Sequence, residues 1–166
     1  MYKIKQFFKR IYNLYRWFPI IWKDQDWDHD YIFEMLKFKL KNQAEYISSK
    51  NRHNTAKRDA EIMMLCVRLI EKVQSDYYGS EYSDYHKSDY KFIDSKDHPG
   101  SYEMKIEEIS ENYDDYFKKY PLIYRMVPDL KASKHKIALD IARINEERAH
   151  KLLFKILEQN IRNWWD

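Results

Sequence analysis

Four aspartates alternate with other residues between positions 24 and 30, and they form the densest group of potential metal ligands in the chain: Asp24, Asp26, Asp28 and Asp30. This spacing matches positions 1, 3, 5 and 7 of a calcium-binding loop. The match fails where His29 replaces the glycine of the sixth position and Met35 replaces the bidentate glutamate of the twelfth. We therefore expect no metal here, and expect the aspartates to start a helix and complement its positive end.

A second potential metal site combines carboxylates with histidines three residues apart: Glu147 with His150, and Asp26 with His29. A di-iron bundle needs two such pairs and two further inward-facing glutamates, for which Glu34 and Glu61 are available. The Asp26 pair precedes its predicted helix, however, and exposed pairs at this spacing are common as surface ion pairs. We expect ion pairs here and predict no metal or cofactor.

Sequence motifs for catalysis are missing as well. The chain has no G-x-x-x-x-G-K-[ST], G-x-G-x-x-G or G-x-S-x-G segment. Its only glycines are Gly79 and Gly100, so a backbone cradle for phosphate is not expected. Cys66 is the single cysteine, which excludes an intrachain disulfide and fits a reducing compartment. We predict no catalytic residue and no enzymatic activity.

The five tryptophans lie near the ends of the first and last predicted helices. One interpretation is a structural clasp that buries Trp17 and at least one of Trp164 and Trp165. A compatible interpretation is a site for an anionic nucleotide, since aromatic faces stack on bases and cations pair with phosphates. Trp22 is the first candidate for stacking. The candidate ligand-binding residues are Arg16, Trp22, Lys23, Trp27, Arg143 and Arg148.

These residues must be positioned by helices, because apolar residues recur at helical spacing and glycine is scarce. We predict an all-α fold, a bundle of about five helices in a single domain over residues 1–166. The helices are expected at about Tyr2 to Phe18, Asp28 or Asp30 to Ser48, Ala56 to Gln74, Ser101 to Tyr120 and Lys134 to Trp164. The second, third and last should form the core. Residues 48–54 are predicted to be a loop, and the Tyr- and Asp-rich residues 76–100 a long loop or lid.

Charge is segregated along the chain. Residues 1–23 carry six basic and no acidic side chains, whereas residues 75–117 carry twelve acidic and four basic ones. The first helix is therefore basic and amphipathic, which suits a membrane surface or, in the interpretation we favour, its own core or a sister subunit. We expect a homo-oligomer, with a dimer favoured. The longest uncharged apolar run, Trp17 to Trp22, is too short to cross a bilayer.

The segment "WFPIIWKDQDWDHDY" together with the terminal "WWD" resembles small bacteriophage-encoded proteins in which W-F-P-I-I-W-K-D begins a helical chain. The resemblance covers the N-terminal third and the last dozen residues. It implies a cytoplasmic protein of an infected bacterium with an accessory or counter-defence role. No catalytic residue is carried over from the group.

Three functions are weighed on this basis. The first is a non-enzymatic, oligomeric protein that binds and sequesters a small anionic nucleotide-like signal. The alternative is a helical interaction module that inhibits a host protein through its first helix or its acidic Tyr-rich loop. The third, less favoured, is metal-assisted nucleotide hydrolysis around Asp24 to Asp30 or at Glu147 and His150.

Overall fold

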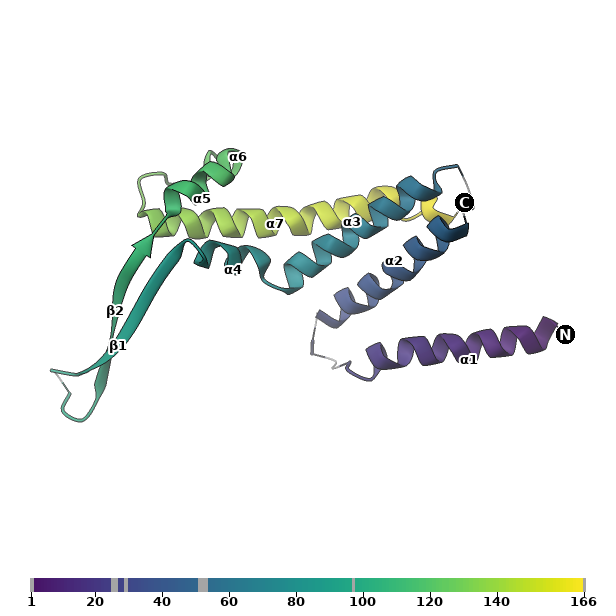
Figure 1. The fold of residues 1–166 in the computed structure, drawn as a ribbon, viewed down its shortest axis with the longest axis horizontal. Coiled ribbons are helices and arrows are strands. Elements are labelled where there is room, and N and C mark those ends of the chain that lie inside the picture. Colours follow the sequence, from purple (N-terminus) through teal and green to yellow (C-terminus); the bar gives the residue numbers. More distant parts are fainter. Residues whose placement is uncertain (1, 25–26, 29, 51–53, 97, 166) are drawn as a thin grey trace. The chain divides into compact units, whose positions relative to one another are not determined.

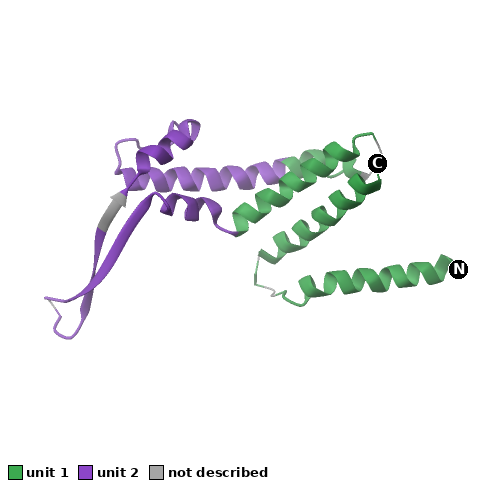
Figure 2. Cartoon of the chain, in the orientation of Figure 1, with its two compact units in different colours: residues 1–74, 156–166 green, residues 75–155 purple. Residues whose placement is uncertain are grey.

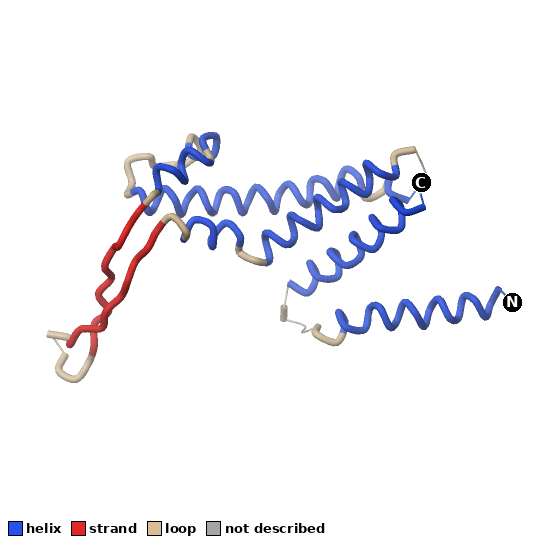
Figure 3. The backbone as a smooth tube through the Cα atoms, in the orientation of Figure 1, coloured by secondary structure: helices blue, strands red, loops and turns tan. Residues whose placement is uncertain are grey.

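The computed structural model describes residues 2–24, 27–28, 30–50, 54–96 and 98–165 (Figure 1). The described residues are mostly helical and contain one two-stranded sheet (Figure 3). The chain divides into two compact units, residues 1–74 with 156–166 and residues 75–155 (Figure 2). The last helix, α7 (Lys134–Asn160), contributes residues to both units. Whether the chain folds as a single domain stays a prediction.

The first unit is built on the helix pair α2 (Asp30–Lys50) and α3 (Ala56–Gln74), whose bounds lie close to the predicted ones. Apolar residues at helical spacing form its core, as the periodicity predicts. The buried residues of the pair include Leu40, Ala44 and Ile47 on α2 and Ala60, Met63, Val67 and Ile70 on α3. The end of α7 and the short 3-10 helix η1 (Asn163–Trp165) complete the unit, where Leu157 and Trp164 are buried.

The first helix, α1 (Tyr2–Ile21), is longer than predicted. We expected Pro19 to end it at Phe18, because proline has no N–H for the helical hydrogen bond. The helix instead runs through Pro19, and the amide of Trp22 donates to the carbonyl of Phe18 over 2.9 Å. One missing hydrogen bond in the last turn is therefore tolerated.

The second unit contains a β-hairpin where no strand was expected. Strands β1 (His86–Asp94) and β2 (Tyr102–Glu111) pair antiparallel, with a bulge between Lys87 and Ser88. His98 to Ser101 make the turn, in which the Ser101 amide donates to the His98 carbonyl over 3.1 Å. Gly100 has φ of 89°, which the third residue of a type II turn requires.

Two predictions for residues 76–120 are therefore wrong. Residues 76–100 are not a long loop, since they include α4 (Tyr77–Ser83) and β1. The predicted helix from Ser101 to Tyr120 is a strand followed by the short helix α5 (Tyr113–Lys119). Apolar residues alternate with charged ones in both strands, which is the period of a strand and not of a helix.

The core of the second unit packs α5 and α6 (Pro121–Tyr124) against the first part of α7. Its buried members are Tyr113, Tyr116, Ile123, Val127, Ile137, Ala138 and Ile141. No helix in the described ranges is both long and apolar enough to cross a membrane.

Glu81 on α4 is a buried carboxylate in this unit, 8% exposed. It accepts hydrogen bonds from Lys119 and from the hydroxyls of Tyr77 and Tyr120. Burial by itself would raise the pKa of Glu81, but the three hydrogen bonds outweigh it and hold that pKa below its ordinary value. The charged form of Glu81 is therefore part of the native packing.

Replacing Glu81 by Ala should lower the free energy of unfolding by about 1.5–3 kcal/mol, because three donors lose a charged acceptor. Because the native pKa is depressed, this stabilisation is present above the unfolded-state pKa and is lost as the pH falls through the native one. Urea unfolding at pH 7 and in the acid range measures both effects. Glu146→Ala, at an exposed position of the same unit, is the control; equal losses for both variants would contradict the assignment.

Candidate functional site

Two neighbouring side chains attach α1 to α2. The Arg16 guanidinium donates to the side-chain oxygen of Asn42 and lies over the ring of Phe38, 5.7 Å from its centroid. Trp17 meets the same Phe38 ring edge to face, with centroids 4.7 Å apart. Both residues are half-buried. Arg16, predicted to bind a ligand, therefore holds two helices together.

The attachment uses the polar side of α1. The half-buried residues of the helix are Arg16, Trp17 and Ile20, and no residue of α1 is buried. At about 100° per residue these three lie opposite the apolar side. That apolar side, the α1 apolar face, is formed by Ile4, Phe7, Phe8, Ile11, Leu14, Tyr15 and Phe18, each 48–78% exposed.

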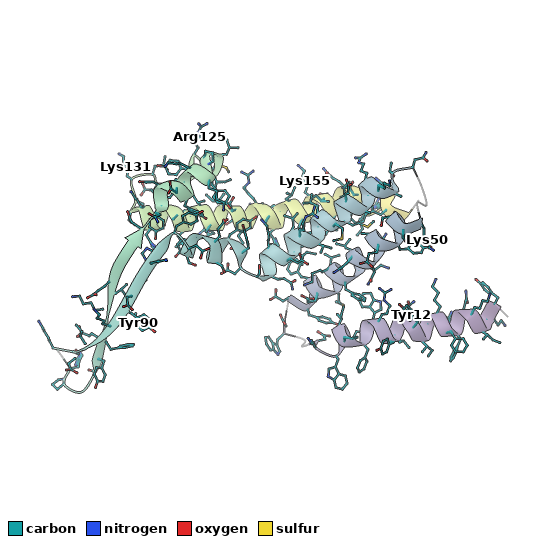
Figure 4. The ribbon with its side chains drawn as sticks, viewed as in Figure 1. Tyr12, Lys50, Tyr90, Arg125, Lys131 and Lys155 are labelled. Atoms are coloured by element: carbon teal, nitrogen blue, oxygen red, sulfur yellow. The ribbon has the colours of Figure 1, made fainter. Side chains whose placement is uncertain are left out.

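We expected this helix to dock on its own core or on a sister subunit. In the described part of the first unit its apolar face does not pack on the core, and docking on a sister subunit stays a prediction. The apolar face of an amphipathic helix normally packs inward. Here, Arg16 and Trp17 occupy the inward side, and the aromatic and aliphatic side chains of α1 project into solvent (Figure 4). An exposed apolar face of this extent is typical of a docking surface.

A cavity of about 440 Å³ lies between α2 and α3, and a second one, of about 630 Å³, lies where α1 is followed by α2. We call the second one the junction cavity. It includes Lys23, one of the predicted ligand-binding residues. Its lining is Pro19, Ile20, Lys23, Asp28, Asp30, Tyr31, Glu34 and Gln74.

The junction cavity has an acidic lining, with three carboxylates against Lys23. Lys37 lies beside it and pairs with Glu34, while its ammonium donates to Gln74 over 3.0 Å. Burial and, second, the carboxylate of Asp24 raise the pKa of the Tyr31 phenol. An amine or a neutral hydrogen-bond donor suits this lining better than a phosphate does.

Two of the four aspartates, Asp28 and Asp30, lie at the start of α2, as expected. Asp28 Oδ1 accepts a hydrogen bond from the Asp30 amide over 2.9 Å, at the first residue of the helix. Asp26 and His29, which complete the calcium and di-iron candidates, lie outside the described residues. Among the residues that are described, no three His, Cys, Asp or Glu side chains are placed to hold a metal ion.

The tryptophans fall into different environments. Trp164 is buried, at 2% exposed, whereas Trp22 and Trp27 are 76% and 81% exposed. Trp17 is half-buried, not buried as the clasp predicted, because it packs mainly against Phe38. The Trp22 ring lies 5.2 Å from that of Phe18 and so continues the α1 apolar face.

The remaining predicted ligand-binding residues lie on the part of α7 that belongs to the second unit. Arg143 Nε pairs with Glu147 over 3.5 Å, and Arg148 Nη1 donates to the sulfur of Met126 over 3.4 Å. Glu147 also pairs with Lys151, and His150 packs on Phe154 with ring centroids 5.0 Å apart. Ion pairs along the helix thus account for Glu147, as expected.

The β-hairpin carries another exposed apolar surface, which the sequence analysis missed. The register places Tyr90 opposite Ile106 and Phe92 opposite Met104, so these four side chains share one face with Tyr102. All five are 57–71% exposed, and one of them, Tyr90, is labelled in Figure 4. The missed signal is the alternation of apolar and charged residues. We call this surface the hairpin face.

Comparisons with known proteins add no functional assignment. No protein-family model, curated protein or solved structure matches the chain. The α1 apolar face, the hairpin face and the junction cavity therefore carry the functional argument.

The environments of the tryptophans predict distinct effects of substitution. Trp164→Ala should lower the free energy of unfolding by about 3–5 kcal/mol, because it leaves a cavity in the core of the first unit. Trp22→Ala and Trp27→Ala should change it by less than about 0.5 kcal/mol, since both side chains are exposed. Thermal and urea unfolding measure the series. If Trp22→Ala unfolds as readily as Trp164→Ala does, then Trp22 is part of the scaffold.

Proposed function

We propose that the protein is a non-enzymatic interaction module that acts by docking α1 on a partner macromolecule. The observation that carries the proposal is the orientation of α1. Its polar side is attached to α2 through Arg16 and Trp17, and its apolar face is exposed. In the setting that the phage resemblance implies, the partner belongs to the infected bacterium and docking interferes with it.

The size of the α1 apolar face supports this proposal. Burying one large apolar side chain contributes about 1.5–3 kcal/mol, so covering even half of the seven residues offers roughly 5–10 kcal/mol. Association itself costs about 4–15 kcal/mol, which means that a face of this size, helped by charge, can produce a stable complex. Each substitution on the face should weaken docking and leave the fold intact.

Site-specific photocrosslinking in cells tests the proposal. A photoreactive amino acid at Ile11 lies in the middle of the α1 apolar face, whereas one at Asn13 lies about 200° around the helix. The full chain should give several-fold more adduct from position 11 than from position 13. The partner, whether protein or lipid, is then identified by mass spectrometry of the adduct.

A double variant tests whether docking can be lost while the fold is kept. Phe7→Ser with Ile11→Ser should change the free energy of unfolding by less than about 0.5 kcal/mol, because neither side chain is in a core. The same substitutions should abolish crosslinking from a probe at Leu14. Equal adducts from positions 11 and 13, or none from either, would contradict a docking role for α1.

Self-association, which the sequence predicted through the first helix, stays a prediction, but the hairpin face suits it better. A symmetric pair of α1 helices would bring cations close to cations, because α1 carries Lys and Arg and no acidic residue. The hairpin carries charges of both signs, and its Lys91 to Glu107 ion pair lies on the opposite face of the strands. A two-stranded sheet is marginally stable in water unless its apolar side is covered. Homodimer adducts from position 11 would instead favour α1 as the contact.

Sequestration of an anionic nucleotide is the second candidate function. One observation favours it: the exposed ring of Trp22 is next in sequence to Lys23, which lines the junction cavity. The carboxylates of Asp28, Asp30 and Glu34 in the same lining work against a phosphate. Arg143 and Arg148 belong to the other unit. This function therefore has less support than docking.

Thermal unfolding in the presence of cyclic and linear nucleotides tests the second candidate. A nucleotide at a hundred times its dissociation constant stabilises the native state by about 2.7 kcal/mol. Lys23→Gln should remove that shift, and Arg143→Gln should keep it. Recovery of the unchanged nucleotide after denaturation would exclude hydrolysis. The absence of a shift with every nucleotide would exclude sequestration.

A further inference from the structure

We infer that the partner of α1 is an anionic lipid surface, on which the helix lies parallel to the membrane plane with its apolar face among the acyl chains. The inference rests on the proposed docking role of α1 and names the partner class. It concerns a helix lying on the surface, which is distinct from a helix that spans the bilayer.

The length of the α1 apolar face favours a lipid surface. Its residues run from Ile4 to Phe18, about four turns, and lie within about 120° of one side of the helix when placed at about 100° per residue. A helix bound in a protein groove typically uses anchors at i, i+3, i+4 and i+7, which span about two turns. An interfacial helix buries its whole apolar face at the boundary between headgroups and acyl chains. At 48–78% exposed, the seven residues of this face are available for such insertion.

The charges of α1 point to an anionic surface. The helix carries five basic side chains and no acidic one: Lys3, Lys5, Lys9, Arg10 and Arg16. Lys3 and Arg10 fall at one margin of the apolar face and Lys5 at the other, where long side chains reach the headgroups while the helix is inserted. Among the described residues, none of these three forms an ion pair within the chain, so their charge is available to phosphate groups.

Aromatic side chains reinforce the same assignment near the end of α1. Tyr15 is 78% exposed and Trp22 is 76% exposed. Tyrosine and tryptophan are enriched at membrane interfaces because an apolar ring and a polar N–H or O–H meet two media at once. The Trp22 ring lies against Phe18, so it extends the inserting surface beyond the last turn.

The contacts between α1 and α2 are compatible with α1 lying on a lipid surface. Arg16 and Trp17 contact Asn42 and Phe38 from the polar side of the helix. The α2 side of the first unit is therefore opposite the inserting face, and α1 can lie on a surface without separating from α2. A symmetric contact with another α1, by contrast, would oppose like charges.

Vesicle flotation with the full chain tests the inference. Vesicles of phosphatidylcholine alone are compared with vesicles in which about a third of the lipid is phosphatidylglycerol. The anionic vesicles should bind at least tenfold more strongly, and binding should weaken at high salt. The double substitution Lys3→Gln with Arg10→Gln should weaken binding by about fivefold per charge removed, on the anionic vesicles alone.

Matched variants test whether α1, and not another apolar surface of the chain, binds the vesicles. Phe7→Ser with Ile11→Ser should reduce binding to anionic vesicles at least tenfold, while Phe92→Ser with Met104→Ser, on the hairpin face, should leave it unchanged. Circular dichroism melts verify that every variant is folded. Asn13→Ser, on the polar side of α1, is the control for substitution in this helix and should bind as the unaltered chain does.

The outcomes distinguish the lipid inference from the proposed docking role. Equal binding to both vesicle types, or loss of binding only in the hairpin variant, overturns the lipid inference. Adducts from position 11 to a protein, in a chain that binds no vesicle, overturn it as well and leave the docking role standing. If neither vesicles bind nor adducts form, both proposals fail. Selective binding to anionic vesicles that requires Phe7 and Ile11 supports the inference.

Discussion

The contact of Arg16 and Trp17 with α2 determines which side of α1 faces solvent. The Asn42 side chain and the Phe38 ring contact the polar side of α1, so the apolar side faces away from α2. Exposing seven large apolar side chains works against the hydrophobic effect, which is worth about 1.5–3 kcal/mol for each one buried. That total is comparable to the whole stability of a typical domain, about 5–15 kcal/mol. An exposed apolar face of this size fits the proposed docking of α1 on a partner, which would bury these side chains.

The second unit also exposes an apolar surface, on its β-hairpin. The hairpin has a type II turn at Pro99 and Gly100, a defined register and a bulge, all of which are specific local structure. Its apolar face is nevertheless exposed, with Phe92 at 64%. The core of the unit lies elsewhere, around Tyr113 and Tyr116. The chain therefore displays an apolar surface from each unit, one on a basic helix and one in its most acidic stretch.

The sequence predicted those elements whose burial agrees with their own periodicity. In α3, Ala60, Met63 and Val67 recur at helical spacing and are buried, so the bounds of the helix follow from the pattern. Residues 102–120 were predicted to be helical because Ile106, Ile109 and Tyr113 also stand at spacings of three and four. The shorter alternation in the same stretch marks the strand. When two periods overlap, only the long-range pairing of β1 with β2 decides between them.

Less of the candidate site than of the fold could be predicted from the sequence. The types of residue around Trp22 and Lys23 indicated a candidate binding surface, but the role of Arg16 depends on a contact that no local pattern contains. The pairing of Arg16 with Asn42 joins residues from different helices.

The amphipathic pattern of α1 was recognised, and the expectation was that its apolar face packs on the core of the chain or on a sister subunit. The structure places that face outward, and the reason is the same long-range contact. Local rules that hold along the rest of a chain tend to fail at sites of function, because a surface reserved for a partner cannot also serve the core. On that argument, the sequence and the orientation of α1 both fit the proposed docking on a partner outside the chain.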